Sequence, residues 1–272
     1  MQNGYLRYYN RHNEETIIGI ERIQIEQDSA RSFHDFTNYS GIDYNRAGTA
    51  LLEIVTLPEV THPTDAKIIV RELQETLKYL KISLANMEEG QMRWDLNISL
   101  THKSDPTIRG DRVEIKNVQG VKFVEKAMES EIIRQAEMLD RGESVVLQTR
   151  RYDVKKDTTV LLRKKEKDLD YRFMYDPDLP SYFISPEMIK SAEKSLDLVP
   201  FDLKKQLKEE FSLTVEQVQF MYSLPELVDY FKSLCSNLGS NVDPQLVYNW
   251  IFIIFTGNWS KVISSYYSLC IL

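Results

Sequence analysis

The chain has 272 residues, of which 42% are hydrophobic and 28% are charged, and its formal net charge is −7. This composition is typical of a globular protein with a sizeable core, and the length suits one large domain or two ordinary ones. So negative a charge disfavours nucleic-acid binding over a broad surface, and such contacts are expected to be local or shared with a partner. We expect no membrane partner, because the longest apolar run, residues 250–255, is too short to span a bilayer.

Short stretches of alternating apolar and polar residues open the chain. Residues 16–26 alternate with period two, but the phase slips near Glu21 and Arg22, which predicts a strand with a β-bulge. Further strands are expected at 41–44 and 50–56, and Glu53 interrupts the apolar run of the second. A carboxylate in such a run is either paired or functional, and Arg46 is a candidate partner.

The strand at 16–26 delivers three oxygen-rich side chains at its end: Glu26, Gln27 and Asp28. Such a cluster can bind a ligand, but it also suits an ordinary polar turn, and both interpretations stay open here. A short polar loop containing His34 is expected to follow.

Two amphipathic helices flank a predicted hairpin. Apolar residues at helical spacing predict a helix at 64–81, with Arg71, Glu72, Glu75 and Lys78 on its outer face. They predict another helix at 120–141 that Gly142 ends. Between them, residues 94–99 and 113–117 alternate as two half-buried strands, with turn signals in the segment that joins them.

One face of the predicted hairpin is apolar and the other is polar. The polar face carries Arg93, Asp95, Asn97, Glu114 and Lys116. Two carboxylates on adjacent strands repel each other unless a cation lies between them, and Mg²⁺ suits carboxylate and amide oxygens. The pattern alone leaves two interpretations open. The more common one is a solvated face with cross-strand ion pairs, and the other is a metal site.

The second half of the chain changes character near residues 177–180. Strands are expected at 145–152 and 158–163, followed by a dense charge run at 164–173 that suits a solvated or a phosphate-facing loop. Beyond it, every strong signal is helical. These signals are Pro186, Pro200, the capping pair Thr214 and Gln217, Pro225, and Asp243-Pro244.

We therefore predict an α+β fold with two domains. Residues 1–184 form a domain with a mixed or antiparallel sheet and flanking helices, and residues 185–272 form a small helical domain. No phosphate-binding loop, dinucleotide fingerprint, Gly-x-Ser-x-Gly elbow or zinc spacing is present. Cys235 and Cys270 form no disulfide framework, which favours a reducing compartment, and both are interpreted as small buried hydrophobic residues.

A series of motifs in a fixed order is similar to one known family. The motifs are residues 25–28 (Ile-Glu-Gln-Asp), 43–48 (Asp-Tyr-Asn-Arg-Ala-Gly), 52–55 (Leu-Glu-Ile-Val), 87–90 (Met-Glu-Glu-Gly), 93–99 (Arg-Trp-Asp-Leu-Asn-Ile-Ser), 114–117 (Glu-Ile-Lys-Asn), 148–153 (Gln-Thr-Arg-Arg-Tyr-Asp), 170–172 (Asp-Tyr-Arg) and 177–180 (Pro-Asp-Leu-Pro). From about residue 16 to about residue 255, the chain resembles the B subunit of glutamine-dependent aspartyl/glutamyl-tRNA amidotransferases.

The resemblance implies a cradle-type catalytic domain and an ATP-dependent ligase that forms a carbon–nitrogen bond. In this family, ATP phosphorylates the side-chain carboxylate of glutamate carried on the tRNA for glutamine. Ammonia released from glutamine by an amidase partner then displaces the phosphate. The implied cofactors are ATP and Mg²⁺, and the implied partners are the amidase (A) subunit, a small C-type subunit and misacylated Glu-tRNA(Gln).

The resemblance also assigns the site residues. The implied metal ligands are Glu26, Gln27, Asp95 and Glu114. The implied contacts to phosphate or substrate carboxylate, which join Asp95 and Glu114 in the catalytic set, are Arg93, Lys116 and Arg172. For each of these three cations, an ion pair that holds neighbouring strands is the alternative.

The chain departs from the bacterial pattern of the family. Gln24 and Gln27 stand where bacterial members usually have His and a second Glu, which resembles the mitochondrial branch and predicts a mitochondrial location. We also expect that the family's amino-terminal segment is missing. Residues 257–272 do not match the sequence pattern of the family, so we expect that its carboxyl-terminal tail domain is missing as well. A second hypothesis is therefore a catalytically incomplete scaffold that binds the amidase. A general RNA-binding module is disfavoured by the net charge.

Overall fold

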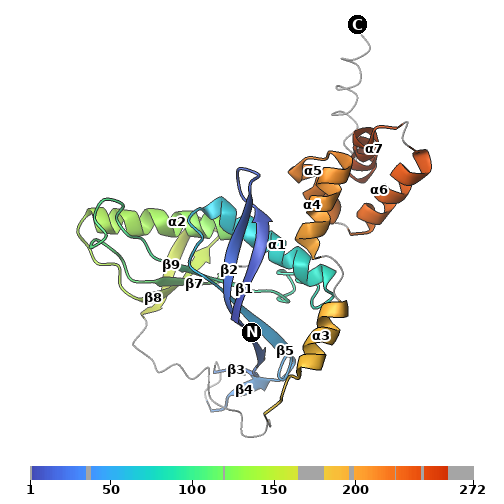
Figure 1. Ribbon diagram of the computed structural model, residues 1–272. Helices are drawn as coiled ribbons and strands as arrows, with labels where there is room; N and C mark the ends of the chain where they lie inside the picture. The colour runs from blue at the N-terminus through green and yellow to red at the C-terminus, as the bar shows by residue number, and fades with distance from the viewer. Residues whose placement is uncertain are drawn as a thin grey trace. The chain divides into compact units, whose positions relative to one another are not determined.

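The computed structural model describes residues 2–34, 38–118, 120–164, 181–195, 199–223, 225–239 and 242–256. The described part confirms the predicted α+β class: three sheets with helices come first, and a helical region from α3 to α7 follows (Figure 1). The chain divides into two compact units, Met1–Val70 and Arg71–Leu272. The domain boundary predicted near residue 184 stays a prediction.

The first unit is built on an antiparallel sheet. Its strands, in spatial order, are β1 (Gln2–Tyr9), β2 (Glu15–Gln27) and β5 (Ala50–Thr56). The register of β2 against β5 shifts between Ile20 and Arg22, which confirms the predicted bulge. Ile18, on the regular part of β2, is almost fully buried and belongs to the core.

A second, two-stranded sheet in the first unit was not predicted in full. It pairs β3 (Arg31–Phe33) with β4 (Gly41–Asp43). The sequence predicted β4 but assigned the segment of β3 to a polar loop. A three-residue strand is too short to show alternation, so only its pairing with β4 identifies it.

The second unit contains a four-stranded sheet. Its strands, in spatial order, are β6 (Trp94–Ile98), β7 (Val113–Val118), β8 (Gln148–Asp153) and β9 (Thr158–Lys164). The predicted hairpin is confirmed, since β6 and β7 are antiparallel. In contrast, β7 and β8 are parallel. Parallel neighbours require a crossover, and α2 (Val121–Asp140) supplies it.

Helix α2 covers one face of this sheet, and Figure 1 shows it running along β7, β8 and β9. Val113 and Ile115 of β7 are fully buried on that face, as are Val124 and Ala127 of α2. The helix ends just before Gly142, whose φ of 71° lies in the left-handed region, so the predicted stop is confirmed.

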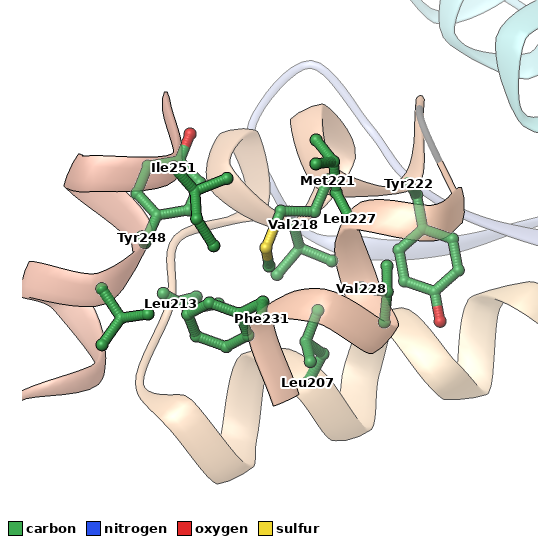
Figure 2. Packing of buried hydrophobic residues seen from close by; sticks show 11 residues of the cluster. Leu207, Leu213, Val218, Met221, Tyr222, Leu227, Val228, Phe231, Tyr248 and Ile251 are labelled. Carbon is green, nitrogen blue, oxygen red and sulfur yellow. The ribbon is translucent and has the colours of Figure 1, made fainter. Parts of the chain in front are cut away.

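The helical region has its own hydrophobic core. Its helices are α3 (Pro186–Ser195), α4 (Pro200–Phe211), α5 (Val215–Tyr222), α6 (Pro225–Leu238) and α7 (Pro244–Thr256). Each predicted proline opens a helix, and the capping box of Thr214 and Gln217 is formed. Figure 2 shows Phe231 beside Leu207 and Leu213 in the buried cluster that α4 to α7 share.

Cys235 is a free, partly buried thiol that packs against this cluster, and burial raises its pKa. Cys270 and the tail at 257–272 lie outside the described residues. Within the described ranges, none of the helices combines the length and the apolar content that crossing a bilayer requires.

Helix α1 (Pro63–Tyr79) confirms the helix predicted at 64–81, and Arg71 and Lys78 are exposed as predicted, but Glu72 was wrongly assigned to the outer face. Glu72 is only 4% exposed, because the ammonium of Lys204 on α4 lies 3.0 and 2.8 Å from its two carboxylate oxygens. Lys204 also bonds Glu75 and is itself almost fully buried. The periodicity of α1 showed a charged face and could not show that a lysine far along the chain covers it.

Candidate active site

Glu114 lies at the centre of the polar face of the four-stranded sheet. It is two residues from Lys116 on β7, and side chains two apart on a strand share one face. Asn97 lies opposite it on β6, and Thr149 lies opposite it on β8. The residues that alternate with this pair, Val113 and Ile115, are buried against α2, so the polar set faces away from that helix.

The ammonium of Lys116 bridges two carboxylates on this face. Its Nζ atom lies 3.2 Å from Oδ2 of Asp95 and 3.1 Å from Oε1 of Glu114. Partial burial lowers the pKa of Lys116, but Asp95 and Glu114 together outweigh that effect and raise the pKa. The sequence required a cation between the two carboxylates, and in this structure the chain provides its own.

Thr149 contacts Glu114 from the neighbouring strand. Its hydroxyl Oγ1 donates to Oε2 of Glu114 at 3.3 Å, and the threonine is only 1% exposed. Thr149 belongs to the motif at residues 148–153, but the sequence predicted no role for it. The contact depends on the parallel register of β7 and β8, which residue patterns do not reveal.

The two predicted arginines are placed differently. Arg93 is exposed and comes directly before the first residue of β6. Arg172 and most of the charge run at 164–173 lie outside the described residues. Their predicted contacts to phosphate or carboxylate therefore stay predictions.

The other two predicted metal ligands lie on β2 in the first unit. Glu26 and Gln27 are consecutive in a regular part of the strand, so their side chains point to opposite faces of the sheet. Gln24 shares the face of Glu26, and its amide donates to Oε1 of Glu26 at 2.6 Å. The predicted joining of Glu26 and Gln27 with Asp95 and Glu114 around one ion stays a prediction.

The acid inside the run of β5 is paired. Glu53 lies 3.8 Å from the guanidinium of Arg22, on the neighbouring strand β2. Arg46, the partner considered from the sequence, donates to Asp28 at 2.8 Å. The end of β2 is thus tied to the turn that precedes β5.

A buried polar network fixes the opposite face of the four-stranded sheet. Glu131 of α2 is fully buried and accepts hydrogen bonds from Arg134, Gln135 and Thr159 at 2.6 to 3.0 Å. Arg150 of β8 lies 3.4 Å from the same carboxylate and donates to the carbonyl of Thr159. The sequence did not predict this network, because the spacing of charged residues along α2 does not show which of them points toward the sheet.

The described residues contain no group of three or more His, Cys, Asp or Glu side chains arranged to hold a metal ion. Asp95 and Glu114 nevertheless both reach one cationic atom, the ammonium of Lys116. Their oxygen donors match the preference of Mg²⁺, so the chemistry of this pair fits the ion that the resemblance implies.

Comparisons with known proteins point to one family. A family model described as the GatB/GatE catalytic domain matches residues 1–190. The chain is 39% identical over 252 residues to the B subunit of the aspartyl/glutamyl-tRNA(Asn/Gln) amidotransferase of Coxiella burnetii, covering 92% of this chain and 52% of that protein. The corresponding B subunits of Legionella pneumophila and Pelagibacter ubique are 38% and 35% identical, over 92% and 86% of the chain. The chain spans about half the length of these curated relatives.

Proposed function

Since this chain belongs to the GatB/GatE catalytic domain family, we propose that it is the catalytic part of the B subunit of a tRNA-dependent amidotransferase. Its substrate is Glu-tRNA(Gln), and its product is Gln-tRNA(Gln). ATP phosphorylates the glutamyl carboxylate, and ammonia displaces the phosphate, so one ATP yields one amide, ADP and phosphate. The relatives share the name of the B subunit of an aspartyl/glutamyl-tRNA amidotransferase, which supports this assignment.

The polar face around Glu114 is the observation that carries the proposal. It lies within the residues that the family model matches, and it gathers Asp95, Glu114, Lys116 and Thr149 on three adjacent strands. A sheet face with two carboxylates and one ammonium suits a reaction between anionic groups, since it offers both signs of charge at fixed positions.

The residues of this face would share the work as follows. Asp95 and Glu114 would hold Mg²⁺, which would neutralise charge on the transferring phosphoryl group when it is bound. The Lys116 ammonium would attract the substrate carboxylate or a phosphate oxygen, as would Arg93 and Arg172. Holding these anions together lowers the electrostatic cost of bringing two negative groups into contact.

The proposed partners are two further subunits and the tRNA. An amidase (A) subunit would release ammonia from glutamine, and a small C-type subunit would complete the complex. The tRNA is the third partner, and the acidic composition of the chain predicts that its grip on the tRNA is shared with other parts of the complex.

A scaffold without catalytic activity is the second candidate. It is favoured by Gln27, an amide where bacterial members usually have a carboxylate, and by the lysine ammonium that lies between Asp95 and Glu114. A site with fewer negative charges binds a divalent cation less tightly. The scaffold would assemble with the amidase and would not turn over.

We propose mitochondrial translation as the setting, on the basis of Gln24 and Gln27. Cell fractionation with the full-length protein tests this setting. Recovery in the mitochondrial matrix supports it, whereas recovery in the cytosol contradicts it.

Reconstitution tests the function itself. The chain is combined with an amidase subunit and the small subunit, and Glu-tRNA(Gln) conversion is followed with glutamine, ATP and Mg²⁺. Conversion that stops when ATP is omitted supports the ligase. A complex that assembles and releases ammonia from glutamine but leaves Glu-tRNA(Gln) unchanged supports the scaffold.

A further inference from the structure

We propose that Thr149 is a positioning residue for Glu114, and that its hydroxyl sets the orientation in which the Glu114 carboxylate meets the cation and the substrate. This inference rests on the proposed function, because it concerns the same polar face. The contact between the two side chains comes from adjacent strands, so the register of the sheet maintains it.

The two carboxylate oxygens of Glu114 have different partners. Oε1 lies 3.1 Å from the ammonium of Lys116, which comes from the same strand, and Oε2 accepts from the hydroxyl of Thr149 at 3.3 Å. A carboxylate held at only one oxygen can still rotate about its terminal torsion, which is a broad one. Partners at both oxygens define the plane of the group.

Thr149 is suited to hold Glu114 still. It is 1% exposed, whereas the side chain of Lys116 is 37% exposed and can exchange its partners with water. A β-branched side chain in a strand has few rotamers, so the threonine hydroxyl has little freedom to turn away. Of the two contacts, the one from Thr149 is therefore the more rigid.

The strand that carries Thr149 is fixed from its other face. The next residue, Arg150, points toward α2, where its guanidinium lies 3.4 Å from the buried carboxylate of Glu131 and donates to the carbonyl of Thr159 at 2.8 Å. The register of β8 against β9 shifts between Thr149 and Arg150, but against β7 it is regular, with Thr149 opposite Glu114 and Arg150 opposite Ile115. The two side chains therefore point to opposite faces, and anchoring Arg150 on the α2 side also fixes Thr149 on the polar side.

Thr149 would act on the reaction through Glu114, by orienting a carboxylate that holds the cation. Hydrogen bonds that orient a metal-binding carboxylate commonly change affinity or activity about 10- to 100-fold when they are lost, although they touch neither metal nor substrate. Thr149 has the burial and the contact that such a role needs. The expected effect is on the Mg²⁺ response and on kcat, with little effect on the binding of tRNA.

Two substitutions separate the hydroxyl from the packing. Thr149→Val keeps the branched shape and removes the donor, and Thr149→Ser keeps the donor and removes a methyl group. A control is Thr158→Val, the same change at a partly buried threonine on β9 whose hydroxyl accepts a hydrogen bond from Ser130 of α2 at 3.2 Å. It is expected to lower the free energy of unfolding without changing the Mg²⁺ response.

The experiment uses the reconstituted complex. Binding of Mg²⁺ alone is measured by calorimetry, kcat and KM for Glu-tRNA(Gln) are measured in the conversion assay, and unfolding is followed with denaturant. We expect Thr149→Val to weaken Mg²⁺ binding and lower kcat by about tenfold each, with KM unchanged, and Thr149→Ser to restore both.

Three outcomes overturn the inference. A Thr149→Val complex that binds Mg²⁺ and turns over like the wild type shows that the hydroxyl does not position Glu114. Equal losses in the Val and Ser variants assign the position to packing. A wild-type complex that binds no Mg²⁺ overturns the inference as well. A wild-type complex that binds Mg²⁺ without converting tRNA contradicts the proposed function alone, and the binding comparison still decides on Thr149.

Discussion

At Lys116, one ammonium lies within hydrogen-bonding distance of carboxylates from two neighbouring strands. All three side chains keep contact with solvent, and such pairs contribute little to stability because water screens them. Their fixed arrangement is thus of more use to a reaction than to the fold. The contrast between stability and activity makes this position testable.

Replacing Lys116 with Met should change stability little and activity strongly. We expect the free energy of unfolding to fall by less than about 1 kcal/mol, since the lysine is partly exposed. Under the proposed function, conversion of Glu-tRNA(Gln) should fall by at least about 100-fold, because the ammonium that would attract the substrate carboxylate or a phosphate oxygen is lost. Denaturant unfolding and the conversion assay measure the two effects.

The control for Lys116 is Lys126→Met, which removes an exposed lysine of α2 that pairs with Asp157. It should leave both quantities near their wild-type values. Wild-type conversion by Lys116→Met would remove the lysine from the proposed mechanism.

At the scale of elements, two buried ionic networks hold helices in place. Glu131 joins α2 to β8 and β9, and Lys204 joins α4 to α1. The central charge of each network, Glu131 or Lys204, is buried, and a buried charge that loses its partner is costly. Substitutions that remove one partner should therefore act on stability.

Glu131→Ala should lower the free energy of unfolding by about 3–5 kcal/mol, because Arg134 and Arg150 both lose the buried carboxylate that pairs with them. The matched control is Glu129→Ala, an exposed carboxylate on the same helix, which should shift stability by no more than about 0.5 kcal/mol. Denaturant unfolding compares the two. Similar losses for both would mean that the buried network does not hold α2.

The same carboxylate predicts a pH dependence of stability. Burial raises the pKa of Glu131, but hydrogen bonds from Arg134, Gln135 and Thr159 outweigh it, so the pKa lies below the ordinary value of 4.5. The stabilisation is therefore complete above about pH 4.5 and is lost as the pH falls through the folded-state pKa. Unfolding of wild type and Glu131→Gln should differ most near neutral pH and converge in acid. A constant difference would contradict this assignment.

The Lys204 network calls for a double-mutant cycle. Lys204→Met leaves Glu72 and Glu75 close together without a cation and should cost about 3–5 kcal/mol. Adding Glu72→Gln removes one of the stranded charges, so the double variant should lose less than the two single losses combined, by roughly 0.5–3 kcal/mol. Lys190→Met, at an exposed lysine of α3, is the control. Strict additivity would show that the pair is not coupled.

For the molecule as a whole, local pattern predicted the elements and long-range contact determined the site. Alternation placed the hairpin, the bulge in β2 and the polar face that carries Glu114, because these features repeat every two residues. It did not place Thr149 beside Glu114 or Lys204 beside Glu72, since residues far apart in the chain make those contacts. The site assignments came from resemblance, which names residues without supplying their geometry.

The central claim is that Glu114 on the polar face serves the amidation reaction. Its most direct test is the conversion of Glu-tRNA(Gln) by the reconstituted complex, with Glu114→Gln compared with Glu129→Gln at an exposed site of α2. We predict that Glu114→Gln assembles with its partners and folds but converts at least about 100-fold more slowly, while Glu129→Gln matches the wild type. Wild-type conversion by a folded Glu114→Gln complex would contradict the claim.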